Sequence, residues 1–211
     1  MKKIFILLLS TLILTSCSAQ DKSPKVLEED GNIYVVLTDG TKKQLTSDQI
    51  DSDPVLLPDN EQVIFVRNQF VNEHQIKIIM QIRIDDLNAS LLTDQKPYED
   101  GLYGTYDIME IINPTVSLDG KHLFFVTEKY ATGSQLVKVN IETGEWTELF
   151  TAESFEIIDK GSYKGNFLVG QSLIEDENGR DIYYRLLDES GKIIKKFSDE
   201  ESMNVFKAEL K

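Results

Sequence analysis

Two segments of 13 residues, 60 positions apart, share one pattern of residue types, and this repeat limits the folds that the sequence can adopt. Residues 54–66 read PVLLPDNEQVIFV, and residues 114–126 read PTVSLDGKHLFFV. Each copy begins with a proline, carries Asp-Asn or Asp-Gly at its centre and ends in an apolar run. Such dipeptides between β-rich runs are typical of hairpin turns. An apolar run without alternation predicts a strand that is buried on both faces.

A second kind of element follows each copy: a β-rich run, a polar turn and a run that closes on an apolar residue plus Thr or Ser. The closing residues are 47, 58 and 47 positions apart and are Thr46, Thr93, Thr151 and Ser198. Four strands in a unit of about 40–50 residues are the signature of a propeller blade. The surplus in the middle interval lies in residues 95–110, QKPYEDGLYGTYDIME, which we call the insertion.

These patterns predict an all-β protein, a small or partial β-propeller of about four blades made of four-stranded antiparallel sheets, over residues 31–211. Each unit is an inner hairpin followed by an outer hairpin, and residues 155–170 give a third, degraded inner hairpin. The first outer hairpin, 33–46, has no inner hairpin before it. The tail, residues 199–211, can form a last strand or a short helix. We favour a strand, in which residues 202–210 add to residues 33–46 and close a ring. The alternative is an open fan of blades, whose exposed edge would dimerise or dock on a partner.

The repeat unit resembles the propeller repeat of TolB-type proteins: Leu-Thr, an acidic loop, Asp-Pro, an apolar pair, Pro-Asp-Gly and an apolar run. The resemblance covers nearly all of residues 33–198 and implies the propeller fold, but no particular activity. The matching segments of the first copy are Leu45-Thr46, Asp51-Ser52-Asp53-Pro54, Pro58-Asp59-Asn60 and Val63 to Val66. Those of the second copy are Leu92-Thr93, Asn113-Pro114 and Leu118-Asp119-Gly120-Lys121.

The N-terminus carries an export signal. Lys2 and Lys3 precede an apolar stretch of 11 residues, 4–14, which is too short to span a bilayer but suits a secretory leader. The stretch ends in Leu14-Thr15-Ser16-Cys17, which resembles the lipobox of bacterial lipoproteins. The resemblance implies cleavage after residue 16, lipidation of Cys17, and a stable anchor of at least two acyl chains, palmitate among them. We expect a leader at 1–16, a lipidated tether at 17–30 and a location in the bacterial cell envelope, facing the periplasm or at the cell surface.

Charge and composition exclude some partners. Loss of Lys2 and Lys3 with the leader changes the formal net charge from −14 to −16, whereas a nucleic-acid binder needs a basic stripe. Cys17 is the single cysteine, so the chain cannot form an internal disulfide. His74 and His122 fall in different repeats without companion ligands, and 176–181 lacks the spacing of a calcium loop. We expect no metal and no cofactor.

The insertion is the segment that we predict to be specific to this protein. It carries Tyr98, Tyr103 and Tyr106 with Asp107, and tyrosines beside acids can stack on a sugar ring or a cationic peptide. The alternative is a loop whose tyrosines only cover one face of the propeller. Two functions follow: a non-catalytic module that binds an envelope protein or glycan, or a hydrolase or lyase that uses carboxylates at the propeller face. No catalytic residue can be named, and a homodimer is expected if the propeller is open.

Overall fold

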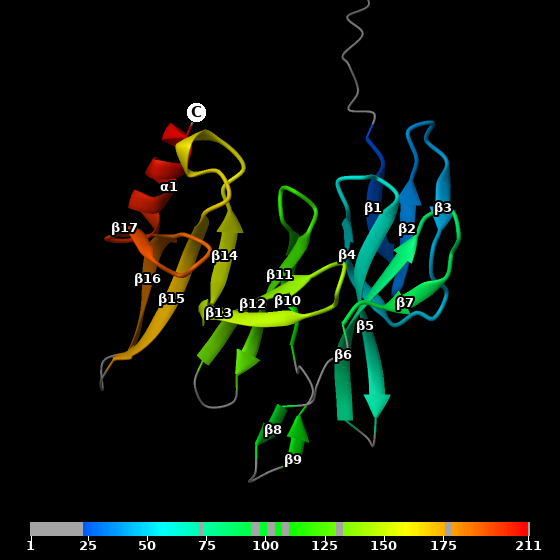
Figure 1. The fold of residues 1–211 in the computed structure, drawn as a ribbon, viewed down its shortest axis with the longest axis horizontal. Helices are drawn as coiled ribbons and strands as arrows, with labels where there is room; N and C mark the ends of the chain where they lie inside the picture. Colours follow the sequence, from blue (N-terminus) through cyan, green and yellow to red (C-terminus); the bar gives the residue numbers. More distant parts are fainter. Residues whose placement is uncertain are drawn as a thin grey trace, which may run out of the picture.

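The computed structural model describes residues 23–71, 74–93, 98–100, 104–106, 110–129, 133–175 and 179–210. Four antiparallel sheets follow one another along an arc (Figure 1). Sheet 1 has three strands, β1 (Lys25–Glu29), β2 (Asn32–Val36) and β3 (Lys42–Gln44). Blades 1, 2 and 3 have four strands each. The propeller prediction is therefore confirmed.

The strands of the three blades are consecutive in the chain, so each blade is a meander. Blade 1 contains β4 (Asp51–Leu56), β5 (Gln62–Val71), β6 (His74–Arg83) and β7 (Ala89–Leu91). Blade 2 contains β10 (Ile112–Val116), β11 (His122–Lys129), β12 (Gly133–Asn140) and β13 (Trp146–Thr151). Blade 3 contains β14 (Ser154–Ile157), β15 (Phe167–Glu175), β16 (Gly179–Leu187) and β17 (Ile193–Phe197).

The two copies of the repeated segment are the inner hairpins of blades 1 and 2, and they have the same backbone. Their turns place Asn60 (φ 59°) and Gly120 (φ 74°) in the left-handed region, which Asn and Gly tolerate best. The Asp59 carboxylate accepts the N–H of Glu61 at 2.9 Å, and Asp119 accepts that of Lys121 at 3.1 Å. These bonds satisfy backbone donors that the turn leaves unpaired.

The inner strands β4 and β10 also share a bulge. Their pairing registers shift between Ser52 and Val55 and between Ile112 and Thr115. The residues before the two prolines, Asp53 and Asn113, have φ values of 50° and 53°. Asp and Asn adopt this conformation more readily than other non-glycine residues, and proline has no N–H to give to a ladder. The prolines thus mark where these two edge strands stop pairing regularly.

The core is layered between sheets. Val63 and Phe65 face sheet 1, whereas Ile64 and Val66 face blade 2. The corresponding run of β11 divides in the same way between blades 1 and 3. In the layer between blades 2 and 3, the rings of Phe124 and Phe167 meet edge to face, 5.0 Å apart. The prediction that the apolar runs are buried on both faces is confirmed.

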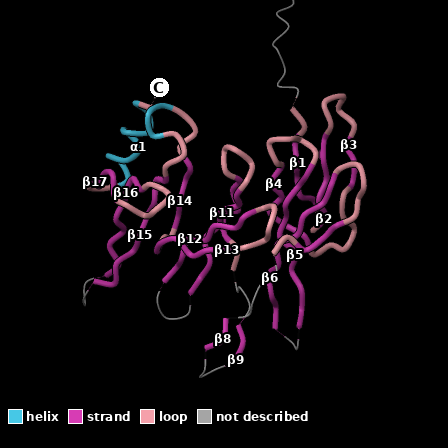
Figure 2. The backbone as a smooth tube through the Cα atoms, viewed as in Figure 1, coloured by secondary structure: helices cyan, strands magenta, loops and turns pink. Residues whose placement is uncertain are grey.

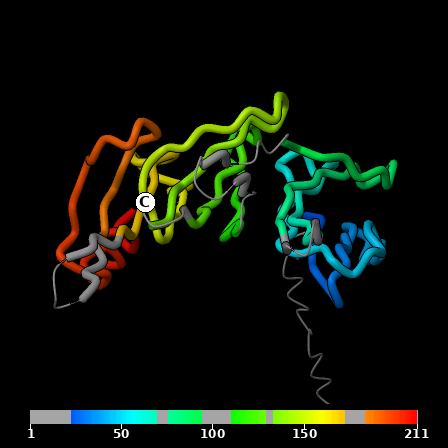
Figure 3. The backbone as a smooth tube through the Cα atoms, turned by 90° about the horizontal axis from the view of Figure 1, so that it is seen from below, coloured from blue at the N-terminus to red at the C-terminus, as the bar shows by residue number. Residues whose placement is uncertain are grey.

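The expected closing strand is wrong. Residues 200–209 form helix α1 (Glu200–Glu209), which begins at Asp199, whose carboxylate accepts the N–H of Ser202 at 2.7 Å. Phe206 packs on Phe197 of the last blade, with ring centroids 5.3 Å apart. The helix therefore covers the face on which a further blade would pack. It lies at the opposite end of the arc from β3, so the described chain forms an open fan (Figures 1 and 3).

The boundary of the tether also needs correction. Residues 25–29, which we expected in the tether, form β1 and pair with β2 through a tight turn at Asp30 and Gly31. Three charged residues in KVLEE hide this strand from a search for hydrophobic alternation. Cys17 lies outside the described residues. Within the part of the chain that the structure describes, no helix has the length and apolarity to cross a membrane.

Candidate binding face

The two central strands of each blade extend beyond their neighbours. In blade 1, pairing between β4 and β5 ends at Arg67, and pairing between β6 and β7 ends at Met80. The last backbone bonds to the flanking segments are those from Asn68 to Ile50 and from Leu92 to Ile79. Among the described strands, residues 69–71 and 74–78 therefore pair only with one another, as a two-stranded ribbon. Figures 1 and 2 show this ribbon at the bottom of the view, and we call this side of the molecule the hairpin face.

Blades 2 and 3 also end in ribbons, and the ribbon of blade 2 is shorter than that of blade 3. In blade 2, pairing between β10 and β11 begins at Val126 and pairing between β12 and β13 begins at Gln135, so residues 127–129 and 133–134 project. In blade 3, residues 171–175 and 179–183 project beyond β14 and β17. The hairpin face is thus a row of ribbons, one for each blade.

The insertion joins this row. Its strands β8 (Tyr98–Asp100) and β9 (Gly104–Tyr106) form a separate two-stranded sheet on the same side (Figure 1). The backbone register places Tyr98 opposite Tyr106. Tyr103 and Asp107 lie outside the described residues. At the end of the insertion, Glu110 accepts a hydrogen bond from the Lys77 ammonium at 2.5 Å, which ties the insertion to the β5–β6 ribbon.

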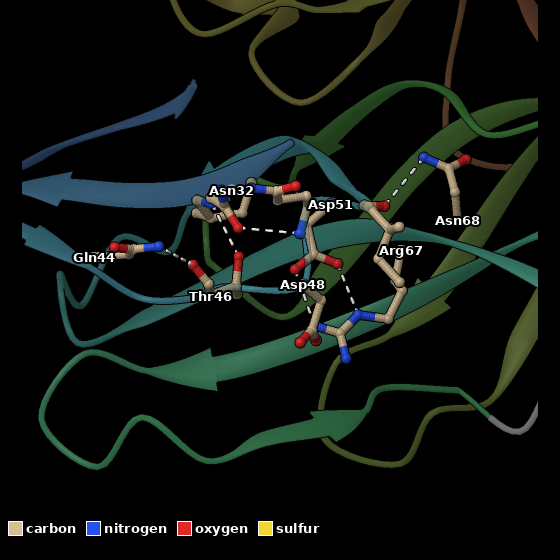
Figure 4. A network of polar contacts seen from close by, with 10 residues as sticks. Asn32, Gln44, Thr46, Asp48, Asp51, Arg67 and Asn68 are labelled. Atoms are coloured by element: carbon tan, nitrogen blue, oxygen red, sulfur yellow. Dashed lines mark hydrogen bonds and ion pairs between the residues drawn. The ribbon is translucent and has the colours of Figure 1, made fainter. Parts of the chain in front are cut away.

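A polar network lies at the base of the first ribbon, between sheet 1 and blade 1 (Figure 4). The Arg67 guanidinium donates to both oxygens of Asp51, at 2.7 and 2.9 Å, and forms an ion pair with Asp48 at 2.8 Å. The Asp51 side chain is fully buried, and that of Arg67 is 15% exposed. The hydrogen bond to Asp51 raises the pKa of Arg67 above its ordinary value. The guanidinium is thus held in place by two carboxylates.

Neighbouring contacts fix the loop that carries these carboxylates. The Thr46 hydroxyl accepts the N–H of Ile33 at 3.0 Å, and the Asn32 side chain accepts the N–H of Gln49 at 3.1 Å. Gly31 has a φ of 72°, and a Cβ atom there would lie 2.6 Å from the backbone of Gln49. The β1–β2 turn therefore packs directly against this loop and holds it at the hairpin face.

The position after the apolar run has a different residue in each blade. Arg67, Thr127 and Gln171 are equivalent in the repeat, and Thr127 and Gln171 are both buried, each 8% exposed. The Gln171 amide donates to the carbonyl of Thr151 in the preceding blade, while its buried carbonyl oxygen has no hydrogen-bond partner among the described residues. This position is therefore polar in all three blades, with different chemistry in each.

The carboxylates whose pKa is shifted lie outside the network of Asp48, Asp51 and Arg67. Hydrogen bonds from a hydroxyl or from backbone N–H groups lower the pKa of four exposed aspartates in turns or at the start of α1, namely Asp39, Asp119, Asp188 and Asp199. These bonds stabilise the charged form, so the shifts reflect turn and cap structure. No group of three or more His, Cys, Asp or Glu residues within the described ranges is arranged to hold a metal ion.

The two histidines do not meet. His122 begins β11, its N–H donates to the hydroxyl of Ser117 at 2.9 Å, and its ring lies 6.3 Å from that of Phe124. His74 begins β6 in another blade.

Sequence reasoning missed the Asp51–Arg67 pair, because residues 16 apart are brought together only by the hairpin register.

Comparison with known proteins agrees with this architecture. Residues 1–18, which include Cys17, match the prokaryotic membrane lipoprotein lipid attachment site. No curated protein matches the chain. The fold is similar to that of TolB from Acinetobacter baumannii, with a TM-score of 0.51 and 18% identity over 81% of this chain and 38% of that one.

Two further structures show the same fold. The tricorn protease has a TM-score of 0.58 and 14% identity over 82% of this chain and 15% of that chain. An oligogalacturonate lyase in complex with manganese has a TM-score of 0.56 and 13% identity over 80% and 43%. The chain thus spans less than half of each of these structures, and identities this low show the fold alone. The protein is a lipid-anchored lipoprotein of the cell envelope with a TolB-like propeller fold.

Proposed function

We propose that this lipoprotein is a non-catalytic binding module that captures an envelope protein on its hairpin face. The observation that carries the proposal is the row of two-stranded ribbons. Among the described strands, residues 69–71 and 74–78 pair with each other only, so each of these segments has one edge whose backbone N–H and C=O groups are not used by the sheet. Such edges are the usual templates for an extended segment of a partner protein.

The position of the anchor supports this assignment. The chain enters β1 from the side that carries the tight inner turns, opposite the hairpin face (Figure 1). Lys25 lies eight positions after Cys17, which gives a tether of at most about 28 Å. The anchor therefore does not compete with a partner for the ribbons. The Lys77–Glu110 ion pair joins the insertion to the same surface, so both can contact one partner.

Within this proposal, the insertion supplies specificity. Tyr98, Tyr103 and Tyr106 would give aromatic contacts, and Asp107 a negative charge for a cationic group of the partner. The matched test is the triple substitution Tyr98→Ala, Tyr103→Ala and Tyr106→Ala. We expect partner capture to fall at least tenfold with little change in thermal stability. Equal capture of the partner by the variant and the wild type would show that the insertion is not part of the binding site.

A photoreactive amino acid tests the proposed face. Placed at Gln69, in the ribbon of β5, it is expected to give a discrete protein adduct in intact cells. Placed at Thr143, an exposed residue in a turn of blade 2, it is expected to give none. An adduct that glycosidases but not proteases degrade would point to a glycan instead of a protein. Equal labelling from both positions, or none from Gln69, would contradict the proposal.

The described residues give no specific support for a hydrolase or lyase. Asp48 and Asp51 are neighbouring carboxylates on the hairpin face, but both bind the Arg67 guanidinium. The carboxylates with lowered pKa values accept hydrogen bonds in exposed turns or cap α1. A general acid needs the opposite shift. The geometry therefore favours binding over acid–base chemistry.

A further inference from the structure

Among the described residues, sheet 1 has no counterpart of the innermost of the four strands that each blade has. The position of its last strand shows which one is missing. Leu45 donates its N–H to Ile33 as β3 ends, and Leu92 donates to Ile79 in the same way as β7 ends. So β2 and β3 correspond to β6 and β7, and β1 corresponds to β5. The place that β4 occupies beside β5 has no counterpart beside β1, which pairs only with β2 among the described strands.

The free edge of β1 differs from the inner edges of blades 1 and 2. Strands β4 and β10 each contain a bulge and a proline, which hinder pairing with another chain. Strand β1 pairs with β2 over all five of its residues without a shift in register, and it contains no proline. It is regular, and its end residues Lys25, Glu28 and Glu29 are exposed. An edge of this kind accepts an added strand.

The sequence of β1 complements itself. If two copies of KVLEE run antiparallel with Leu27 at the centre, Lys25 of each copy faces Glu29 of the other. Leu27 then faces Leu27, and Val26 faces Glu28. Opposite charges placed directly across an antiparallel pair stabilise it, and the two-fold axis repeats the Lys25–Glu29 contact. We propose that two copies of this protein dimerise by pairing their β1 strands, which fills the vacant position in sheet 1 and forms a continuous six-stranded sheet.

The other end of the fan explains why pairing would stop at two copies. Helix α1 covers the last blade through Phe206, so that end offers no free sheet face for a head-to-tail array. Pairing through β1 is symmetric and closes after one partner. Within one copy, Glu29 already bonds to Lys42, and its side chain is still 53% exposed. It can therefore face the partner's Lys25 without a buried bond being broken.

Both anchors can reach one membrane. The two β1 strands leave the dimer in opposite directions, and a strand of five residues is about 17 Å long. Each tether spans up to about 28 Å. When the paired strands lie along the membrane plane, both Cys17 residues therefore reach the bilayer.

Cysteine cross-linking of the full-length lipoprotein in dilute detergent micelles tests the pairing. Leu27→Cys places two thiols opposite each other at the two-fold axis, about 5 Å apart at Cβ, and oxidation is expected to give a covalent dimer. Tyr34→Cys is the matched control. It lies beside Leu27 on β2, so in the dimer its two copies are three strand spacings apart, about 14 Å, and they do not cross-link. A monomeric Leu27→Cys protein, or equal cross-linking of both variants, would overturn the proposal.

A charge exchange provides the second test, in the Leu27→Cys background. Lys25→Glu and Glu29→Lys should each lower dimer yield about fivefold or more, because like charges then face each other. The double variant should restore the yield. Lys42→Gln removes the partner of Glu29 within the chain and should not lower it. If the double variant stays as low as the singles, the pairing does not have the proposed register and the proposal fails. Thermal melts of each variant separate loss of pairing from loss of fold.

Discussion

The two inner hairpins have one backbone but fill the same buried position in two ways. In blade 1, Asp51 pairs with Arg67. In blade 2, the equivalent residues are Ile111, in the apolar layer against blade 1, and Thr127. The same bulge and the same turn are therefore compatible with either residue pair, Asp51 with Arg67 or Ile111 with Thr127. The repeat therefore specifies the path of the chain, while the chemistry between adjacent sheets is free to vary.

The largest expected effect comes from breaking the ion pair on one side. Arg67→Thr gives blade 1 the residue found in blade 2 but leaves the fully buried Asp51 without its main partner. We expect a loss of about 3–5 kcal/mol in the free energy of unfolding, measured by urea denaturation. Arg83→Thr is the matched control. Arg83 is 45% exposed and bonds to exposed carboxylates, so its loss should cost about 1 kcal/mol or less.

A second comparison concerns two glycines with positive φ. Gly144 sits where the outer turn of blade 2 meets blade 1, and an added Cβ would lie 2.5 Å from the carbonyl oxygen of Leu92. Gly40 lies in the outer turn of sheet 1 with open space around it. We expect Gly144→Ala to cost about 2–4 kcal/mol and Gly40→Ala about 1–2, since only the first adds a clash to backbone strain. Equal losses in urea denaturation would show that Gly144 does not set the spacing of the blades.

The third prediction converts one hairpin into the other. The double variant Asp51→Ile with Arg67→Thr carries the residue pair of blade 2 at the junction of blade 1. Replacing a buried ion pair by apolar groups is often neutral, so we expect stability within about 1.5 kcal/mol of the wild type. The variant should thus be more stable than Arg67→Thr alone. If it is less stable, the network around Asn32 and Thr46 requires the charged pair.

The fourth prediction exchanges the turns. Asn60→Gly introduces the residue that blade 2 has at this position and relieves a left-handed non-glycine conformation. We expect a gain of about 0.5–1 kcal/mol, measured by thermal unfolding. The reverse change, Gly120→Asn, places a Cβ 3.2 Å from the side chain of Pro58 in the neighbouring blade and should destabilise. A gain from both would mean that the two turns do not differ in their surroundings.

The smallest effect is expected from pH. The Ser117 hydroxyl, together with the Lys121 N–H, lowers the pKa of Asp119 in the folded state. A carboxyl with a lowered folded-state pKa stabilises the fold above its unfolded-state pKa of about 3.9 and loses that contribution as the pH falls through the folded value. The stability difference between wild type and Asp119→Asn should therefore be larger at pH 7 than at pH 3. A difference that is constant over this range would show that the charge of Asp119 does not matter.

Local signals in the sequence were sufficient for the blades. The Asp59-Asn60 and Asp119-Gly120 turns and the apolar runs after them identify the inner hairpins, because turn chemistry and burial act over a few residues. The Asp51–Arg67 pair was beyond this kind of reasoning. A hairpin that kept its turn register would place Asn68 opposite Asp51. The bulge at Asp53 and Pro54 shifts the register by one residue and brings Arg67 there instead.

The two ends of the chain were harder to predict than the middle. The strand at 25–29 owes its structure to pairing with β2, and its charged residues look like those of a tether. The sequence also contains a local signal for helix α1, but the closing strand was favoured over it. Asp199 followed by Ser202 is a reciprocal cap, in which each side chain bonds to the other's backbone N–H. The insertion could be located by its length, but no pattern in the sequence indicated its β8–β9 hairpin.

The open fan has a consequence for folding speed. A closed propeller must join its first and last strands, a contact that spans the whole chain and costs loop-closure entropy before it contributes stability. Here each sheet is built from consecutive strands, and each core layer joins neighbours in sequence. The chain can therefore nucleate in any blade and propagate outward, as repeat arrays do. Folding of the described sheets therefore requires no contact between the first strand and the last, which favours faster folding than a closed propeller allows.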